Sequence, residues 1–250
     1  MSYNAPINPN YDLESRRIEA VTTCVGFDDI LDVTLGYNHG QVDTMIVVTS
    51  HDDTATQKCC MKHDVICVQT DLFKKNGRNF NKGAAINAGF NYFQYHGWRM
   101  HLDSDIVLPD QFSRILFNHT HLDRNFIYGA LRLDVIGLDN LEKIKNAKPS
   151  HSKYKINTPD AGLAHLSNMY IDPINGYVPI GFFQLWHSSQ QKSYPYSLGT
   201  AAHDDVMFGA QWASQHRHLL PNIVCHHLCS QSPKWGENWD GKRQQPRLEK

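Results

Sequence analysis

The chain has 250 residues, and its 24 Lys and Arg against 25 Asp and Glu give a formal net charge of −1 at pH 7. This length can bury a substantial core, as one large domain or two fused halves. The near-zero charge gives no general electrostatic footprint for nucleic acid, although 15 His would make the surface basic in mild acid. No stretch approaches the roughly 18 apolar residues that span a membrane. The polar N-terminus lacks the apolar segment of a signal peptide, so we expect an intracellular protein.

Strand and helix patterns alternate over the first hundred residues. Continuous apolar runs predict strands covered on both faces, and apolar residues at helical spacing predict the helices between them. The predicted elements are strand 18–25, helix 28–37, strand 45–48, helix 54–62, strand 65–69, helix 82–95 and strand 98–102. Such repeats imply right-handed crossovers and a parallel sheet that binds ligands beyond the carboxyl ends of its strands.

The second half of the chain is less regular. It predicts strand 126–131, a surface helix 139–147, a polar loop 148–170, an aromatic strand 178–186, a loop 188–200, helix 203–215, strand 223–228 and a polar tail 230–250. Gly181 inside the aromatic strand indicates a bulge or a close approach by a ligand. We see no internal repeat and no flexible linker. The pattern therefore predicts one α/β domain with a central, mostly parallel sheet flanked by helices.

The six cysteines predict reduced thiols. Cys24 and Cys67 lie in predicted core strands, where a thiol behaves as a small apolar group. A zinc site is the alternative; its ligands would be Cys59, Cys60, His63, Cys225 and Cys229. Their spacing matches no standard zinc knuckle, which favours free thiols.

Asp103-Ser104-Asp105 directly follows the apolar run 98–102. If the segment stays extended, the two carboxylates point the same way at the end of a buried strand. There they could hold one hard divalent cation through oxygen ligands, which suits a ligand with its own negative charge such as a diphosphate. Asp-x-Asp also occurs in ordinary turns, so the motif alone is weak.

Asn81-Lys82-Gly83 opens the helix before that strand. Free N–H groups at a helix N-terminus attract anions, and Lys82, with Arg78 upstream, adds charge suited to phosphate. The alternative is a solvated basic loop followed by a helix that packs on the sheet.

Five segments together resemble the nucleotide-sugar half of a GT-A fold glycosyltransferase: RIEAVTTCVGFDDIL, VDTMIVVTSHDDTATQ, VICVQTDLF, FNKGAAINAGFNYF and WRMHLDSDIVLP. The pair FNKGAAINAGF and HLDSDIVLP is similar to motifs of family 2-like and β-galactosyltransferase-like enzymes. GFFQLWH, AAHDDVMF and HHLCSQSPKWGENWDGKR resemble the second half of small bacterial and phage proteins of this fold. The resemblance implies a nucleotide-sugar-binding half over about 15–130 and an acceptor-binding half with a C-terminal tail over about 131–250.

The resemblance also implies roles for individual residues. Those on the nucleotide-sugar side would be Thr22, Thr23, Ser50, Asp52, Arg78, Lys82, Asp103, Lys242 and Arg243. The metal ligands would be Asp103, Asp105 and His227, with Asp105 the surer of the two aspartates. The general base would be Asp205, or Asp204 if the latter is not merely a helix cap. The second strand ends in Thr49-Ser50-His51-Asp52-Asp53 and lacks the Asp-Asp-Gly-Ser usual in the family, which weakens the base-binding assignment.

The implied reaction moves a sugar from a UDP-sugar to an acceptor hydroxyl with Mn²⁺ or Mg²⁺, and favours inversion. The aromatic strand would line the acceptor side through Phe183, Gln184 and Trp186. A glycan, a small metabolite and a hydroxymethyl-pyrimidine in phage DNA stay open as acceptors. For DNA, a local basic patch in the tail would serve: Lys234, Lys242, Arg243, Arg247 and Lys250. The expected location is the cytoplasm of a bacterium or a phage-infected cell.

Two other classes compete. A nucleotidyltransferase also uses a strand-end Asp pair with a metal, but it would need a Gly-rich basic loop after the first strand, and residues 25–29 lack one. A non-catalytic nucleotide-sugar-binding module would not need Asp105, Asp205 and His227 together.

Overall fold

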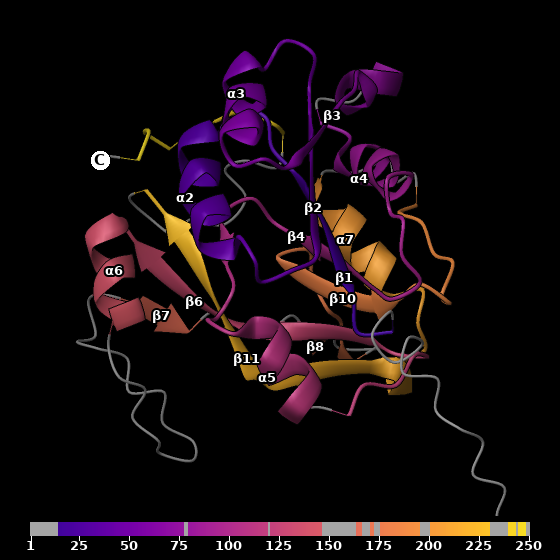
Figure 1. Cartoon of the computed structure of the whole chain (residues 1–250). Helices are drawn as coiled ribbons and strands as arrows, with labels where there is room; N and C mark the ends of the chain where they lie inside the picture. Colours follow the sequence, from indigo (N-terminus) through magenta and orange to yellow (C-terminus); the bar gives the residue numbers. More distant parts are fainter. Residues whose placement is uncertain are drawn as a thin grey trace, which may run out of the picture.

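The computed structural model describes residues 15–77, 80–119, 121–146, 164–166, 171–172, 176–195, 201–230, 240–243 and 245–248. In this part of the chain a single sheet of nine strands carries helices on both faces, which confirms the predicted α/β class (Figure 1). The strands are β1 (Ile18–Thr23), β2 (Thr44–Thr49), β3 (Ile66–Gln69), β4 (Trp98–Leu102), β5 (Ile106–Val107), β6 (Ile127–Ile136), β7 (Ala164–Leu166), β10 (Phe183–His187) and β11 (Arg217–Cys229). A separate small hairpin joins β8 (Ile171–Asp172) to β9 (Gly176–Tyr177).

The helices are α2 (Asp28–Asn38), α3 (Thr54–Lys62), α4 (Lys82–Phe90), α5 (Phe112–His119), α6 (Leu138–Asn146) and α7 (Ala201–Gly209), with 3-10 turns η1 (Leu72–Gly77) and η2 (Ser214–His216). None of the helices within the described ranges is long and apolar enough to cross a bilayer.

The strand order is β3-β2-β1-β4-β10-β6-β11-β5, with β7 on β6. β1, β2, β3 and β4 are parallel to one another, and β10 is antiparallel to both of its neighbours, β4 and β6. β11 is parallel to β6. The strands β1, β2, β3, β4, β6 and β11 therefore run in one direction, and their carboxyl ends share one edge of the sheet. The sheet is continuous across both halves implied by the sequence.

Alternating side chains of the central strands divide the helices between the two faces. Val47 of β2 packs in one cluster with Leu31 of α2 and Cys60 of α3. Its neighbours Ile46 and Val48 pack in another with Ile86 of α4, together with Phe208 of α7. α2 and α3 thus cover one face and α4 and α7 the other (Figure 1).

The close approach of α4 to the sheet depends on Gly89. A Cβ there would lie 2.4 Å from Cγ2 of Val21. The helix ends at Phe90, five residues before the predicted end, because the backbone that follows is hydrogen-bonded to a buried carboxylate of β1. Glu19 accepts the backbone N–H groups of Gln94 and Tyr95 at 2.8 and 2.9 Å.

β11 is much longer than the predicted strand and contains a bulge. Leu220 pairs with Ala130 of β6, but the next pair along β6 is Leu131 with Val224. Residues 221–223 are therefore extra on the β11 side of the ladder. Beyond the bulge the strands pair again in regular register as far as Cys229 and Ile136.

Candidate active site

The two aspartates after β4 are separated by a turn. The chain turns at Ser104 and Asp105, closed by a hydrogen bond of 3.2 Å from the Ile106 N–H to the Asp103 carbonyl. β5 then pairs with β11, where Ile106 lies opposite His227. The segment is not extended, so the two carboxylates meet different partners. Asp103 faces Lys82, and Asp105 faces His227.

His227 lies between two carboxylates. Its Nε2 is 3.2 Å from Oδ2 of Asp105, and its Nδ1 is 2.8 Å from Oδ1 of Asp134. Asp134 stands on β6 directly beside His227 in the strand register, and Arg132 Nε is 3.3 Å from the same Asp134 oxygen. Burial lowers the pKa of His227, but Asp105 and then Asp134 outweigh burial and raise it well above its ordinary value.

The spacing of Asp105 and His227 fits one divalent cation. Adjacent ligands around an octahedral ion at ~2.1 Å are about 3 Å apart, close to the observed 3.2 Å between Oδ2 and Nε2. A carboxylate behind a ligating imidazole fixes its tautomer and orientation, and Asp134 is placed to do this. Asp103 is not gathered with them. Among the described residues, the one group of three His, Cys, Asp or Glu side chains whose ligand atoms lie within 4.8 Å of one another is at a different place in the fold.

Lys82 joins the carboxyl end of β4 to α7. Its Nζ is 2.6 Å from Oδ1 of Asp103 and 3.3 Å from Oδ2 of Asp205. Burial lowers the pKa of Lys82, but these carboxylates outweigh burial and raise it. The lysine is therefore a permanent positive charge next to two carboxylates. As the first residue of α4, it also adds this charge to the positive end of the helix dipole.

Asp205 is a buried carboxylate with an unusual titration. Burial raises the pKa of Asp205 to about 7, and Asp103 and Asp204 add to this effect while Lys82 opposes it. Its Oδ1 has no hydrogen-bond partner among the described residues. Gln184 Nε2 donates to the Asp205 backbone carbonyl at 2.9 Å, which helps to hold this turn of α7. A carboxylate that is half ionised near neutral pH is suited to proton transfer.

Asp204 has a different place from its neighbour. It lies within α7 and is not the cap of that helix. Its Oδ2 accepts the Gly83 N–H at 3.0 Å, so it satisfies a free donor at the start of α4. Asp204 therefore ties α4 to α7, and this contact favours Asp205 as the reactive carboxylate of the pair.

A buried hydrogen-bonded chain lies beneath the carboxylates. Tyr194 O–H donates to Oε1 of Gln184. The Tyr194 oxygen is 2.7 Å from Nδ1 of His101. Burial, with Lys82 nearby, lowers the pKa of His101 well below its ordinary value, so the imidazole is neutral. Its Nε2 is 3.5 Å from Oδ1 of Asp103, which places an uncharged ring against the acidic cluster.

The residues predicted for the acceptor side are core residues. Phe183 and Trp186 have no exposed surface, and they pack on opposite faces of the sheet. Their rings therefore have no free face for an acceptor, which corrects that expectation. The reason is that β10 is a central strand between β4 and β6. Gln184 is also fully buried and acts through its contacts with Tyr194 and Asp205.

The loops predicted to bind the base and ribose lie at the carboxyl ends of β1 and β2. Thr22, Thr23 and Ser50 are buried there, and Thr22 Oγ1 has no hydrogen-bond partner in the described part of the chain. The side chain of Asp52 is 74% exposed, 3.6 Å from Lys74. Its neighbour Asp53, for which the sequence predicted no role, organises both loops. It accepts the Gly26 N–H at 2.7 Å and the Thr56 N–H at 3.1 Å.

The basic residues predicted to reach a diphosphate fall into three groups. Arg78 lies outside the described residues, as do Lys234 and Lys250, which were predicted for the basic patch of the tail. Lys242 is exposed. Arg243 is fully engaged by protein groups: its two terminal nitrogens are 2.5 and 2.8 Å from the Asp29 carboxylate, and one of them also donates to the Gly26 carbonyl at 3.1 Å. Arg243 therefore fastens the tail to the start of α2, which corrects its assignment to the diphosphate.

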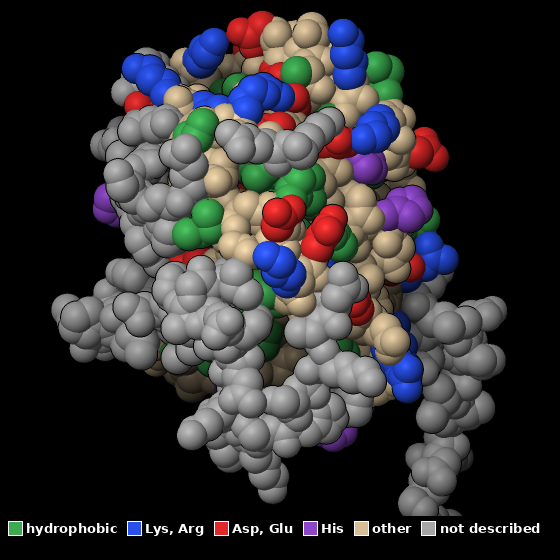
Figure 2. Space-filling model, turned by 90° about the vertical axis from the view of Figure 1, so that its left-hand side faces the viewer, with side chains coloured by type: hydrophobic (Ala, Val, Ile, Leu, Met, Phe, Trp, Pro, Cys, Tyr) green, Lys and Arg blue, Asp and Glu red, His purple; other side chains and the backbone are tan. Residues whose placement is uncertain are grey.

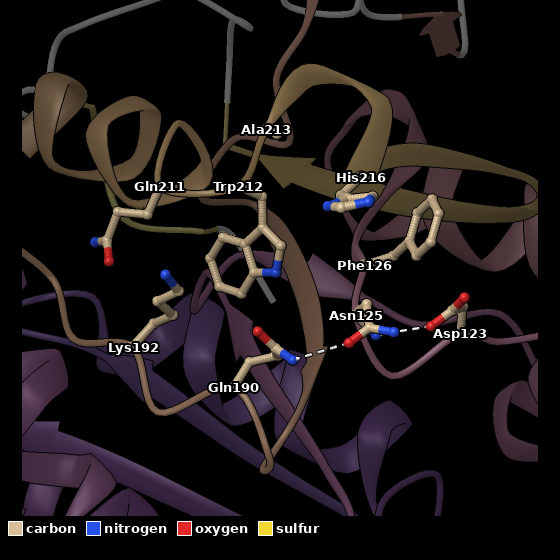
Figure 3. A pocket seen from close by; sticks show the side chains of 9 residues that line it. All are labelled: Asp123, Asn125, Phe126, Gln190, Lys192, Gln211, Trp212, Ala213 and His216. Carbon is tan, nitrogen blue, oxygen red and sulfur yellow. Dashed lines mark hydrogen bonds between the residues drawn. The ribbon is translucent and has the colours of Figure 1, made fainter.

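A cavity of about 330 Å³ is lined in part by residues that follow β10 and α7 in the chain, such as Gln190 and Trp212 (Figure 3). Trp212 and Phe126 supply its aromatic walls, and Gln190 in its lining donates a hydrogen bond of 3.4 Å to Asn125. It contains none of the predicted site residues. The candidate active site is thus defined by converging side chains and not by this cavity.

No protein-family model matches the chain, and no curated protein matches it in sequence. Among solved structures, it is similar to glucosyl-3-phosphoglycerate synthase from Mycobacterium tuberculosis in complex with Mn²⁺, UDP and glucosyl-3-phosphoglycerate. The identity is 11% over 93% of this chain and 80% of that one, with a TM-score of 0.49. A structure of that synthase with Mg²⁺ and UDP gives 12% identity, 93% and 79% coverage and a TM-score of 0.49.

Mannosyl-3-phosphoglycerate synthase from Rubrobacter xylanophilus is similar over a shorter region. The identity is 14% over 48% of this chain, the TM-score is 0.38, and the match spans 43% of the length of that synthase. At these identities and TM-scores, the likenesses concern the path of the chain and assign no substrate.

Proposed function

We propose that this chain is a metal-dependent glycosyltransferase of GT-A architecture that moves a sugar from a UDP-sugar to an acceptor hydroxyl with inversion. One observation carries the proposal. Three groups converge at the carboxyl ends of β4, β6 and β11, beside α4 and α7. They are a carboxylate–imidazole pair spaced for a cation, a buried lysine, and a carboxylate whose pKa is about 7.

The donor side is formed by Asp105 and His227, which would hold Mn²⁺ or Mg²⁺, with Asp134 orienting the imidazole. Asp103, the third predicted ligand, is paired with Lys82 and would join the ion only on leaving that lysine. When bound, the ion supplies positive charge for the diphosphate of the donor. A carboxylate–imidazole ligand set suits Mn²⁺ well and also accepts Mg²⁺.

Lys82 stabilises the leaving diphosphate. Its ammonium is nearly buried, and its charged form is favoured by Asp103 and Asp205. A fixed positive charge in a poorly solvated site is worth more to a developing anion than the same charge in water. The lysine is the first residue of α4, so the positive end of the helix dipole adds to its charge.

Asp205 acts as the general base. It accepts the proton of the acceptor hydroxyl as the oxygen attacks the anomeric carbon, and the bond from that carbon to the diphosphate oxygen breaks on the opposite face. The product therefore has an inverted anomeric centre. The pKa of about 7 matches the operating range of such a base.

The described surface favours no single class of acceptor. The described residues of the face in Figure 2 show acidic and basic side chains side by side, as expected from the net charge of −1. This pattern gives little support to a non-specific duplex-binding surface.

The test is to incubate the protein with UDP- and GDP-sugars, Mn²⁺ and three acceptor classes: glycan oligosaccharides, small alcohols and hydroxymethylated DNA. We expect metal-dependent release of UDP and one acceptor whose mass rises by a sugar. Asp205→Asn, which has nearly the same shape, is the matched control. Donor binding in wild type that is unchanged by EDTA, or equal transfer by Asp205→Asn, would contradict the proposal.

A further inference from the structure

We propose a second metal site, of the zinc type, formed by Asp32, Cys59 and His63 between α2 and α3. One ligand atom from each of the three residues lies within 4.8 Å of the other two. The site is on the face of the sheet covered by α2 and α3, whereas α4 and α7, which carry Lys82 and Asp205, cover the other face. It is therefore separate from the candidate active site and does not depend on the proposed function.

Local helix geometry brings the ligands together. Cys59 lies in the last turn and a half of α3, and His63 is the residue that follows the helix, four positions later. Side chains four apart lie over one another on a helix face, so thiol and imidazole share that face. The backbone N–H of His63 donates to the Cys59 carbonyl at 3.2 Å, so the helical path of the backbone continues to His63.

The third ligand comes from the neighbouring helix. Oδ1 of Asp32 on α2 is 2.7 Å from Nε2 of His63. The cluster is partly protected from water, because Cys59 is 7% exposed and the side chains of His63 and Asp32 are 15% and 21% exposed. These fractions leave an approach from solvent and a position for water as a fourth ligand.

The ligand chemistry distinguishes this site from the one at Asp105 and His227. A thiolate with an imidazole and a carboxylate selects Zn²⁺ or Co²⁺ over Mg²⁺ and Mn²⁺, which prefer oxygen ligands. Asp32 and the Cys59 thiolate would together neutralise a divalent ion. Three protein ligands and one open position form a tetrahedral set.

Lys62 is the competitor for this site. Its Nζ lies 2.6 and 2.8 Å from the two oxygens of Asp32. The Lys62 side chain is 62% exposed, so it can leave Asp32 and remain solvated in water. An ion bound here would replace the ammonium and would link α2 to α3 directly.

The test titrates the full-length, reduced, metal-free protein with Co²⁺. The background variant is Asp105→Ala with His227→Ala, which removes the other cation site. We expect one equivalent of Co²⁺ with thiolate-to-cobalt charge-transfer absorption, displaced by Zn²⁺. Cys59→Ser should lose this absorption and His63→Gln should weaken binding at least tenfold, whereas Cys60→Ala, whose thiol is not in the cluster, should retain both.

Lys62→Met provides a variant that improves the site and does not damage it. It should bind Co²⁺ more tightly, because it removes the competing ammonium. Zn²⁺ should raise the Tm of the background protein and of Lys62→Met, but not that of Cys59→Ser. Absence of the thiolate absorption in the background protein, or the same absorption in Cys59→Ser, would overturn the proposal. If Cys59→Ser does not fold, unchanged affinity in folded His63→Gln overturns it equally.

Discussion

Gly181 and Asp205 are so close that a Cβ on the glycine would lie 1.9 Å from Oδ2 of the aspartate. Any side chain at position 181 must move the carboxylate or the backbone. We expect Gly181→Ala to lower kcat by about a hundredfold, the cost of misplacing a reacting group by about 1 Å, with donor affinity retained. Gly36→Ala is the control. Gly36 lies in α2, and a Cβ there would be 3.8 Å from its nearest neighbour, Cε1 of His63, so activity should be unchanged.

The two adjacent carboxylates of α7 should behave differently when each is changed to an amide. Asp205→Asn should lower turnover by about a hundredfold or more, the scale of general-base catalysis. Asp204→Asn keeps an oxygen that can accept the Gly83 N–H, so it should remain active, whereas Asp204→Ala should lose about 1–3 kcal/mol of stability. Steady-state kinetics and urea unfolding measure both effects. An active Asp205→Asn with an inactive Asp204→Asn would exchange their roles.

The pH dependence of kcat/KM should report Asp205. The base works only when ionised, and burial raises its pKa to about 7. Activity should therefore rise tenfold per pH unit below pH 7 and level off above it. The residual rate of Asp205→Asn should lack this limb. A flat profile from pH 5.5 to 8 in the wild type would exclude a base of this pKa.

Asp134 should control metal affinity without touching the ion. Asp134→Asn removes the charge behind His227 but keeps a hydrogen-bond acceptor. Loss of such a partner typically weakens metal binding about tenfold to a hundredfold. Mn²⁺ binding in the presence of UDP, followed by electron paramagnetic resonance, measures this change. Asp123→Asn, at an exposed turn, is the control and should bind Mn²⁺ as the wild type does.

Arg243 should contribute to stability rather than to donor binding. Its guanidinium forms a two-point contact with Asp29, which also accepts the Leu248 N–H at 2.6 Å. We expect Arg243→Gln to lose about 1–3 kcal/mol of unfolding free energy, the range for hydrogen bonds to charged groups. KM for the donor should be nearly unchanged. A double-mutant cycle with Asp29→Asn should show coupling. A large rise in KM for the donor in Arg243→Gln, with unchanged stability, would show instead that Arg243 binds the diphosphate.

Local pattern was enough for the first half of the fold. Predicted 54–62 and 98–102 coincide with α3 and β4, because Asp53 caps the start of the helix and the apolar run of the strand ends at Asp103. The helix α5 was not predicted from the sequence, although its residues have amphipathic spacing. The predicted helix 203–215 corresponds to α7, which begins at Ala201 and ends at Gly209. Neither the direction of β10 nor its place between β4 and β6 has a local signature. Burial of Phe183 and Trp186 follows from that place, so their role was predicted wrongly.

Site residues could be predicted where they belong to a local sequence motif. They could not be predicted where their role depends on a contact with a residue far away in the sequence. Lys82, Asp103 and Asp205 do meet, as the resemblance implied. Asp134 is 93 residues from His227 and has no neighbouring motif, so only the pairing of β6 with β11 identifies it. The spacing of Asp103 and Asp105 likewise does not reveal that the backbone turns between them.

The bulge at residues 221–223 decides which of two adjacent histidines belongs to the site. Side chains alternate along β11, so His226 and His227 point to opposite faces. Burial lowers the pKa of His226 to about 4, whereas His227 meets Asp105 and Asp134. Inserting one residue into the bulge, with the pairing before it kept, would shift the rest of β11 by one place, so that His226 would stand where His227 now stands and face Asp105. Natural variation in this segment should therefore tolerate substitutions but not changes of a single residue in length.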